Sequence, residues 1–336
     1  MRADVALPAA DEAEAPSASP ASQDVGLGGA WDRSLAGLRA LDQRVADVAY
    51  RIVTANVALC TERAPQTGLV LQTALEYGPR LRAAAEAAFH IDDRPAIEAV
   101  AAASPAALAG LRTDDIVLAV DDQPLAADQP AEPGRPDTRP ATYAPVEAAQ
   151  ARIAQALRSG AAAITVRRGQ QTLRFEIAGQ PGCAYDAQVL PGPNLSASAD
   201  GRHVFISAAL VSYARSDDML ALVLGHEFAH DVLHHHRRLD QVGLARKTLG
   251  DLGSTPASLR LAEAEADYVG LYLSARAGYD ISAAPAFWRL FPSVDGDLGW
   301  SHPGAAERAV SLAATRDEIL AKQKSGQPLV PNPPTR

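Results

Sequence analysis

Several features of membrane proteins and nucleic-acid-binding proteins are missing from this chain of 336 residues. No apolar run approaches the roughly 18 to 20 residues that a membrane helix requires, so no membrane span is expected. The net charge is -9 and Lys and Arg form no dense run, which argues against nucleic acid or an anionic membrane surface as a partner. Residues 1–30 lack the apolar core of a signal peptide. They are interpreted as a disordered leader, or as the exposed start of a mature protein whose export signal is absent.

Cysteine is also scarce. The two cysteines, Cys60 and Cys183, do not have the C-x-x-C spacing of a zinc or redox site. They bracket a separate module, described below, so an oxidising compartment would allow a disulfide that closes a loop around it. Two buried free thiols are the alternative.

Residues 220–234 form the stretch around which the rest of the chain is organised, an apolar helix with an H-E-x-x-H motif. Four residues advance an α-helix by about 40° past one full turn, so His226 and His230 project from one face and can share a metal ion. Glu227 lies about 100° round from His226, close enough to act on a metal-bound water. Ser216 is the expected N-cap. The pattern predicts a zinc hydrolase with a carboxylate as general base.

A second helix, expected over residues 261–273, carries the candidates for a third metal ligand. Glu263 and Asp267 share one face at i and i+4, so one carboxylate can bind the metal while the other hydrogen-bonds a ligand imidazole. Glu265 points elsewhere, and spacing alone leaves the assignment open. His234 continues the face of the two motif histidines. We interpret it as a non-ligand, because a fourth fixed imidazole would close the position that a catalytic zinc keeps for water.

Residues 95–180 differ in character from the rest of the chain. Strands are expected over 97–100 and 115–120, a short helix over 104–111, a helix over 146–157, and a hairpin over 164–177 with its turn at 168–170. Elsewhere, helices are expected over 31–57 and 79–89. A strand that ends near Ser207, beside the zinc helix, is expected either to hold an extended peptide at its edge or to serve only core packing.

Residues 104–116 resemble a bacterial PDZ domain, whose recurring phrase is S-P-A-x-x-A-G-L followed by G-D-x-I. Asp114 stands where that family prefers glycine, so a left-handed backbone is expected there. Residues 121–144, rich in Pro and Asp, are interpreted as an insertion. The resemblance implies that an extended peptide, usually a C-terminus, binds by strand addition. The alternative is a degenerate module that only packs on its neighbour, because the loop before Ile97 has no clear glycine signature.

The catalytic region resembles a known family through phrases that occur in a fixed order. These are H-E-x-x-H at 226–230, E-x-E-A-D at 263–267, Gly270, A-G-Y-D at 277–280, and S-H-P at 301–303 with Arg308. Over about residues 196–319 the chain is similar to the metallopeptidase family of the CAAX prenyl endopeptidases, HtpX and the periplasmic protease BepA. Ser196 stands where relatives often have Asn. The membrane helices of the prenyl and HtpX branches are absent, which favours the soluble branch and argues against a prenylated substrate.

The resemblance implies a role for each matching residue. The ligands of one Zn²⁺ per chain would be His226, His230 and Glu263. Glu227 would be the general base, and Asp267 the carboxylate that hydrogen-bonds a ligand histidine. His302 matches a histidine near the metal that either blocks its open position or assists catalysis, and Arg308 matches an arginine near the active site.

The expected fold is α+β, and 47% apolar residues suffice for sizeable cores. After the leader at 1–30, an N-terminal helical region at 31–93 is expected to pack on the catalytic domain. A PDZ-like domain of β-sandwich or barrel type should occupy 94–180. A mostly helical, zincin-type (gluzincin) metallopeptidase domain with a small edge sheet should occupy 181–324, followed by a disordered tail at 325–336.

The expected function is that of a zinc-dependent endopeptidase acting on peptides or unfolded proteins. By analogy, extracytoplasmic protein quality control in the periplasm is the expected setting, with a cytoplasmic location left open. The PDZ-like domain would recruit the substrate or a partner, such as a C-terminal peptide. The alternative is a PDZ-based binding or assembly factor with a latent metal site.

Overall fold

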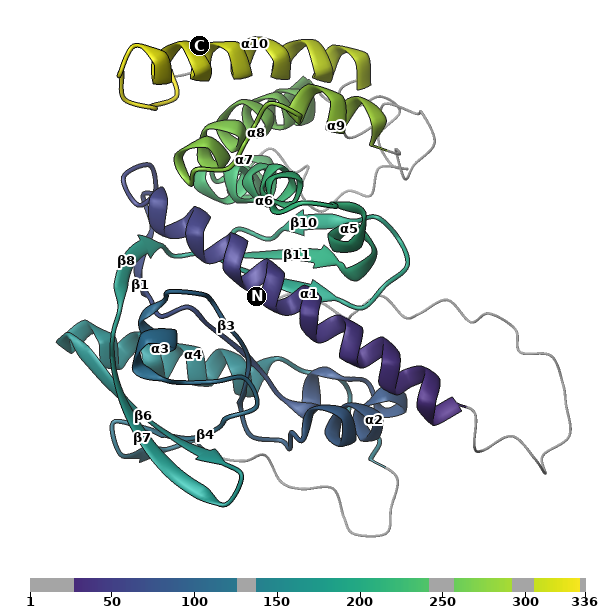
Figure 1. The fold of residues 1–336 in the computed structure, drawn as a ribbon, viewed down its shortest axis with the longest axis vertical. Coiled ribbons are helices and arrows are strands. Elements are labelled where there is room, and N and C mark those ends of the chain that lie inside the picture. Colours follow the sequence, from purple (N-terminus) through teal and green to yellow (C-terminus); the bar gives the residue numbers. More distant parts are fainter. Residues whose placement is uncertain (1–26, 126–136, 242–256, 292–304, 333–336) are drawn as a thin grey trace, which may run out of the picture. The chain divides into compact units, whose positions relative to one another are not determined.

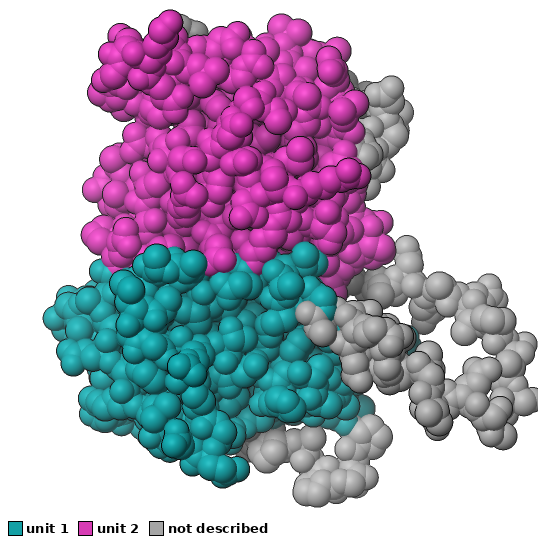
Figure 2. Space-filling view, viewed as in Figure 1, with its two compact units in different colours: residues 1–43, 67–179 teal, residues 44–66, 180–336 magenta. Residues whose placement is uncertain are grey.

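The computed structural model describes residues 27–125, 137–241, 257–291 and 305–332 (Figure 1). The chain forms two compact units: residues 1–43 with 67–179 are unit 1, and residues 44–66 with 180–336 are unit 2 (Figure 2). Helix α1 (Leu27–Ala55) contributes to both units. Among the described helices, none combines the length and the apolar character needed to cross a bilayer.

Unit 1 is built on one antiparallel sheet of six strands. The strand order is β2-β3-β4-β6-β7, with β5 paired to β4. Its strands are β2 (Leu69–Gln72), β3 (Ala96–Val100), β4 (Ile116–Val120), β5 (Gln123–Pro124), β6 (Ala161–Arg168) and β7 (Gln171–Ala178). Its helices besides α1 are η1 (Ala74–Glu76), α2 (Pro79–Phe89), α3 (Pro105–Ala109), α4 (Ala144–Ala156) and η2 (Leu157–Ser159).

Helices cover both faces of this sheet where β3 and β4 pair. Successive strand residues point to opposite faces. Ile97 and Val117 accordingly join a core with α4, while their neighbours Ala96 and Ile116 join a second core with α2 and the start of α1. A sandwich or barrel was expected from the sequence. The described strands instead form one open sheet, because helices bury the face that a second sheet would cover.

Local signals in unit 1 had the predicted outcome. The Ser104 hydroxyl accepts a hydrogen bond from the Ala107 amide at 3.2 Å and so caps α3, which ends at Gly110 with a φ of 95°. Asp114 adopts the expected left-handed backbone, with a φ of 69°. The predicted hairpin is formed by β6 and β7, which pair from Ala161–Ala178 to Arg168–Gln171.

The segment 31–93 does not behave as one helical region. Its first part, through Gln43, belongs to unit 1, residues 44–66 belong to unit 2, and residues 67–93 return to unit 1. The reason is β2, which pairs with β3 and carries the following helix α2 with it into unit 1. With only four residues, β2 is too short to show a strand pattern in the sequence.

Three carboxyl groups lie close together in unit 1. Asp42 on α1 hydrogen-bonds Glu98 on β3; burial and the charge of Glu98 raise the pKa of Asp42 to about 9, although Arg39 opposes the shift. Burial likewise raises the pKa of Glu98 to about 7. Glu76 is a third group whose pKa burial raises, and Glu98 and Asp42 add to the shift. Between the ordinary carboxyl pKa near 4 and these values, the folded state holds more protons than the unfolded state.

We therefore expect the free energy of unfolding to fall as the pH rises from about 5 to about 9. Asp42→Asn keeps a hydrogen-bonding side chain that cannot ionise, and should flatten this dependence. Urea unfolding across the pH range would measure it. Asp122→Asn, at an exposed position in the same unit, is the control and should retain the wild-type slope. An unchanged slope in Asp42→Asn would show that the pair does not set the pH response.

Unit 2 combines two small sheets with a group of helices. Strands β1 (Arg63–Gln66) and β8 (Gln180–Cys183) pair antiparallel, and a three-stranded sheet has the order β10-β11-β9. Its strands are β9 (Asp186–Leu190), β10 (Ala197–Ala199) and β11 (His203–Ser207). Its helices are α5 (Ala208–Tyr213), α6 (Asp217–Val232), α7 (His235–Gln241), α8 (Ala257–Arg276), α9 (Ala284–Leu290) and α10 (Ala305–Lys324).

Two sets of long-range links join segments of unit 2 that are far apart in the sequence. Cys60 and Cys183 form a disulfide with a Cα–Cα distance of 5.5 Å, in accord with the pairing expected for an oxidising compartment. The expected disordered tail is ordered over residues 325–332. Arg276 donates to the Leu329 carbonyl at 2.9 Å, and Tyr268 accepts from the Asn332 amide at 3.1 Å. These contacts with α8 hold a segment whose composition gave no sign of structure.

Candidate metal centre

Helix α6 forms where the motif predicted it. The Ser216 hydroxyl caps its first turn by accepting from the Met219 amide at 3.2 Å, as expected. Nearly every residue from Leu220 to Val232 is buried, including Glu227 at 9% exposure. Burial on all sides explains why the helix shows little amphipathic periodicity, and it holds the motif rigidly.

The crossing of α6 and α8 depends on two glycines in backbone contact. A Cβ on Gly270 would lie 2.8 Å from the backbone of Gly225 and from the Cα of His226. Ser274 adds a hydrogen bond from its hydroxyl to the Ala221 carbonyl at 2.8 Å. This close approach brings the carboxylates of α8 to the histidines of α6.

Replacing Gly270 with Ala is expected to destabilise the protein by about 1–3 kcal/mol, the usual cost of overpacking. The clash involves backbone atoms, which cannot rotate away, so it exceeds the gain in helix propensity of up to about 1 kcal/mol. The free energy of unfolding, measured with urea, and the affinity for zinc should both decrease. Gly37 in α1 is the matched control, because nothing lies within 4 Å of an added Cβ there. Equal stability of the two variants would show that the helices separate without cost.

The three expected metal ligands converge. Nε2 of His226 lies 3.2 Å from Nε2 of His230 and 3.3 Å from Oε2 of Glu263. Nε2 of His230 lies 3.6 Å from Oε1 of Glu263. A tetrahedral zinc with bonds of about 2.0–2.1 Å separates its ligand atoms by about 3.3 Å, so this set fits zinc. Within the described ranges, no other trio of His, Cys, Asp or Glu comes as close.

The outer nitrogen of His226 is held by a buried ion pair. Nδ1 of His226 lies 2.9 Å from Oδ1 of Asp267, and Arg308 binds the same carboxylate at 2.6 and 2.8 Å. The Arg308 guanidinium stacks 3.5 Å from the centroid of the Trp288 ring. A carboxylate that orients the ring of a metal-binding histidine is the usual support for such a ligand. Sequence spacing had suggested this role for Asp267, but nothing in the sequence indicated Trp288.

The electrostatics of the centre favour a positive charge. Burial alone would lower the pKa of His226, but its hydrogen bonds to Asp267 and Glu263 raise that pKa to about 9. Burial would raise the pKa of Asp267, yet His226 and Arg308 hold it below its ordinary value. The carboxylates that stabilise a proton on His226 would equally stabilise a metal ion.

Arg308 and His302 were both expected near the metal. Arg308 is only 6% exposed and contacts Asp267, so the geometry gives it a positioning role; contact with substrate stays a prediction. His302 lies outside the described residues, and its role as a latch or catalytic group stays a prediction.

The end of α6 corrects the expectation that His234 continues the face of the two motif histidines. The helix ends at Val232 and His234 has a φ of 54°, so His234 does not continue the motif face. Its Nε2 lies 2.9 Å from the Thr61 hydroxyl. The chain turns back instead, and Nδ1 of His235 lies 3.0 Å from Nδ1 of His230. The sequence showed three adjacent histidines but could not reveal which one returns to the site.

Glu265 was expected to point elsewhere than Glu263 and Asp267, and it is not among the three converging ligands. It contacts His235, whose Nε2 lies 3.0 Å from Oε2 of Glu265. Burial lowers the pKa of His235, and Glu265 only partly opposes the shift. Burial would raise the pKa of Glu265, but hydrogen bonds from Arg238 and His235 lower it. Glu265 is therefore a carboxylate beside a neutral imidazole.

The strand predicted to end near Ser207 is present as β11, but it is the central strand of the three-stranded sheet, so the expectation that its own edge holds a peptide is wrong. Its neighbour β10 is at one end of that sheet, contacts α6, and is partly exposed. The turn between β10 and β11 is fixed to α6 by the Gly201 amide, which donates to Oδ1 of Asp231 at 2.8 Å. The edge of β10 is thus held at a defined place relative to the motif.

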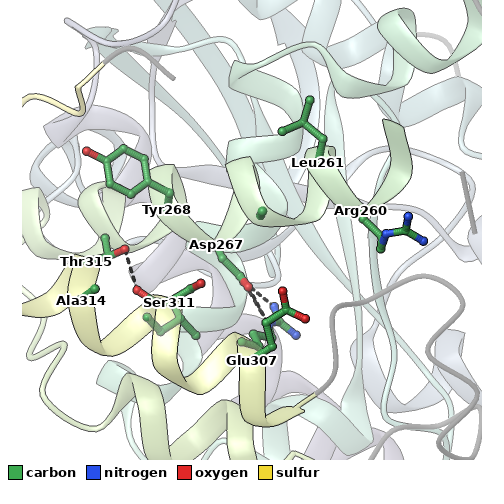
Figure 3. A pocket seen from close by; sticks show the side chains of 11 residues that line it. Arg260, Leu261, Asp267, Tyr268, Glu307, Ser311, Ala314 and Thr315 are labelled. Atoms are coloured by element: carbon green, nitrogen blue, oxygen red, sulfur yellow. Dashed lines mark hydrogen bonds and ion pairs between the residues drawn. The ribbon is translucent and has the colours of Figure 1, made fainter. Parts of the chain in front are cut away.

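A pocket of about 440 Å³ lies between α8 and α10 (Figure 3). Asp267 and Arg308 line it together with Tyr268, Glu307 and Ser311. The candidate ligands and Glu227 do not line it. The pocket therefore lies behind the ion pair that supports His226, and it is not the place where a peptide bond would meet the metal.

Two family models match parts of the chain. Residues 97–132 match the model of the PDZ domain, and residues 167–250 match the model of peptidase family M48. Among solved structures, the HtrA3 PDZ domain bound to a phage-derived ligand is 21% identical, covers 36% of this chain and 89% of that chain, and has a TM-score of 0.25.

Curated relatives are mitochondrial metalloendopeptidases named OMA1. The Schizosaccharomyces pombe protein is 27% identical over 159 residues, which are 40% of this chain and 47% of that protein. The Arabidopsis thaliana protein is 32% identical over 130 residues, 33% of this chain and 27% of that protein. The Bos taurus protein is 29% identical over 161 residues, which are 37% of this chain and 31% of that protein. The chain thus spans less than half the length of these relatives. Together the matches show that residues 97–132 are similar to the PDZ domain and that residues 167–250 are similar to peptidase family M48.

Proposed function

We propose that the protein is a zinc-dependent endopeptidase. The observation that carries this proposal is the convergence of His226, His230 and Glu263, with ligand atoms 3.2 to 3.6 Å apart beside a buried Glu227. Three protein ligands leave the fourth position of a tetrahedral ion open, which is the arrangement of catalytic rather than structural zinc sites. The M48 and OMA1 matches support the same activity.

Each residue of the centre has a distinct task in this proposal. His226, His230 and Glu263 hold the ion, and a bound zinc would polarise the scissile carbonyl and lower the pKa of water to about 7. Glu227 accepts the proton of the attacking water and returns it to the leaving amine. Asp267 keeps the proton of His226 on Nδ1, so that Nε2 remains free to bind.

We further propose that the substrate is an extended peptide that adds to the edge of β10. That strand contacts α6, has one neighbour in the sheet, and is partly exposed. Backbone hydrogen bonds along such an edge bind peptides with little dependence on sequence. Unfolded proteins are the natural source of extended chain, so a role in protein quality control fits this geometry.

The PDZ-like unit is proposed to recruit a peptide, such as a C-terminus, at the free edge of β2. This strand is at one end of the sheet order and Leu69 and Val70 are half-buried. The loop before it contains Gly68, with a φ of 79°. The loop before Ile97 has no clear glycine signature, but the loop before the edge strand β2 contains this glycine. Peptide binding without cleavage would favour the alternative, a binding or assembly factor with a latent metal site.

An oxidising, extracytoplasmic compartment is proposed from the Cys60–Cys183 disulfide. The relatives are named as mitochondrial, which differs from the periplasm expected from the sequence. The disulfide supports an oxidising compartment, and it fits both an organelle and the cell envelope.

Cleavage of an unfolded protein before and after metal removal tests the proposed activity. A chelator should abolish cleavage, and stoichiometric zinc should restore it, because the ion is needed both to polarise the carbonyl and to activate water. Magnesium serves as the control, since it prefers oxygen ligands in octahedral geometry and should not restore activity. Cleavage that persists at zero zinc content would reject a zinc peptidase.

A further inference from the structure

The two ligand histidines are supported in parallel ways. Nδ1 of His226 reaches the carboxylate of Asp267 on α8, and Arg308 binds that carboxylate. Nδ1 of His230 reaches a carboxylate on α8 only through a second imidazole, because His235 lies between it and Glu265. Arg238 binds the same oxygen of Glu265 at 2.7 Å. Each ligand histidine is thus connected to a carboxylate that an arginine holds.

The positions of the protons follow from the metal side. Nε2 is the atom of His230 that faces the other two ligands, so it must be unprotonated when an ion is bound. A neutral imidazole then carries its proton on Nδ1, which donates to Nδ1 of His235 across 3.0 Å. His235 must accept there, so its own proton lies on Nε2 and points to the Glu265 carboxylate. One arrangement of protons therefore satisfies both contacts.

Because His235 is buried, both of its ring nitrogens need hydrogen-bond partners. Its side chain is 2% exposed, whereas that of Glu265 is 11% exposed and that of Arg238 is 50% exposed. A buried imidazole nitrogen without a partner would be destabilising, and both ring nitrogens of His235 have one. Arg238 contacts Glu265 at the exposed end of this chain of contacts. The series from Arg238 through Glu265 and His235 to the ligand His230, called the relay below, therefore runs from solvent to the metal site.

We propose that His235 and Glu265, held by Arg238, are positioning residues for the zinc ligand His230. The relay fixes the ring orientation of His230, keeps its proton on Nδ1 and increases the basicity of Nε2. The inference rests on the proposed zinc site and deepens it by two residues that do not touch the metal. Outer partners of this kind usually change metal affinity by about 10–100-fold when removed.

Zinc affinity, measured by competition with a chromophoric chelator, tests the relay without depending on peptidase activity. His235→Leu removes both hydrogen bonds and is expected to weaken zinc binding by about 10–100-fold. His235→Asn offers a carbonyl oxygen to the Nδ1 proton of His230 and should recover part of the loss. Glu265→Gln keeps an acceptor oxygen without the charge and should give an intermediate loss. His236→Asn, at the exposed adjacent histidine, is the control and should bind zinc as the wild type does.

The visible absorption of the protein loaded with Co²⁺ provides a second readout, because it reports the ligand field directly. His235→Leu and Glu265→Gln should shift these bands, and His236→Asn should not. Wild-type affinity and an unshifted spectrum in both relay variants would overturn the proposal. If His235→Leu does not fold, Glu265→Gln decides, since it preserves shape.

Failure of the proposed peptidase function would give a different pattern from failure of the relay. In the first case the relay variants lose zinc affinity although the wild type cleaves no substrate. In the second case the wild type cleaves and binds zinc, and the variants bind it equally well. A wild-type protein that binds no zinc would overturn both proposals.

Discussion

Glu227→Gln is expected to retain zinc and to lower peptidase turnover by at least about 10²–10⁴-fold. General-base help alone is worth about that factor, and the carboxylate also orients the attacking water. Glutamine preserves the volume of this side chain, which is only 9% exposed, so packing around α6 should remain intact. Turnover of one unfolded substrate, measured at equal zinc occupancy, gives the comparison.

The matched control is Glu307→Gln on α10, an exposed glutamate to which the mechanism assigns no task. It should leave turnover and zinc content unchanged. If Glu227→Gln kept turnover within about tenfold of the wild type, a different group would have to take the proton, and the general-base assignment would be wrong.

Glu263→Ala should act on the metal rather than on the proton. Removal of one of three ligands is expected to weaken zinc binding by more than the about 10–100-fold that follows loss of an outer hydrogen-bond partner. The change also leaves Nε2 of His226 without the oxygen that lies 3.3 Å away. Chelator competition measures the loss, and turnover should fall with zinc occupancy.

A zinc titration separates this variant from the preceding one. Excess zinc should restore part of the turnover of Glu263→Ala by mass action, whereas it should have no effect on Glu227→Gln, which already holds the ion. Normal zinc affinity in Glu263→Ala would move the third ligand elsewhere. Glu265 would then be the first candidate, and the relay proposed for His235 would fall with it.

Local sequence was sufficient for the parts of the site that lie on single helices. The i, i+4 spacing of His226 and His230 determines that they share a face of α6, and the same spacing places Glu263 and Asp267 on one face of α8. The short helix after Ser104 and the left-handed Asp114 followed from cap and turn chemistry in the same way. These features depend on neighbours within one or two turns, which the sequence displays directly.

Tertiary structure decided everything that depends on how distant segments meet. Arg308 is 82 positions from His226, and its place behind Asp267 follows from the packing of α10 against α8. His235, rather than His234, reaches His230 because α6 ends at Val232 and the backbone reverses through a left-handed residue. Glu265 meets that histidine because Gly225 and Gly270 let α6 and α8 approach at backbone distance. Periodicity specifies which residues share a face of one helix, whereas the partner of that face is set by close packing between helices, which no local pattern encodes.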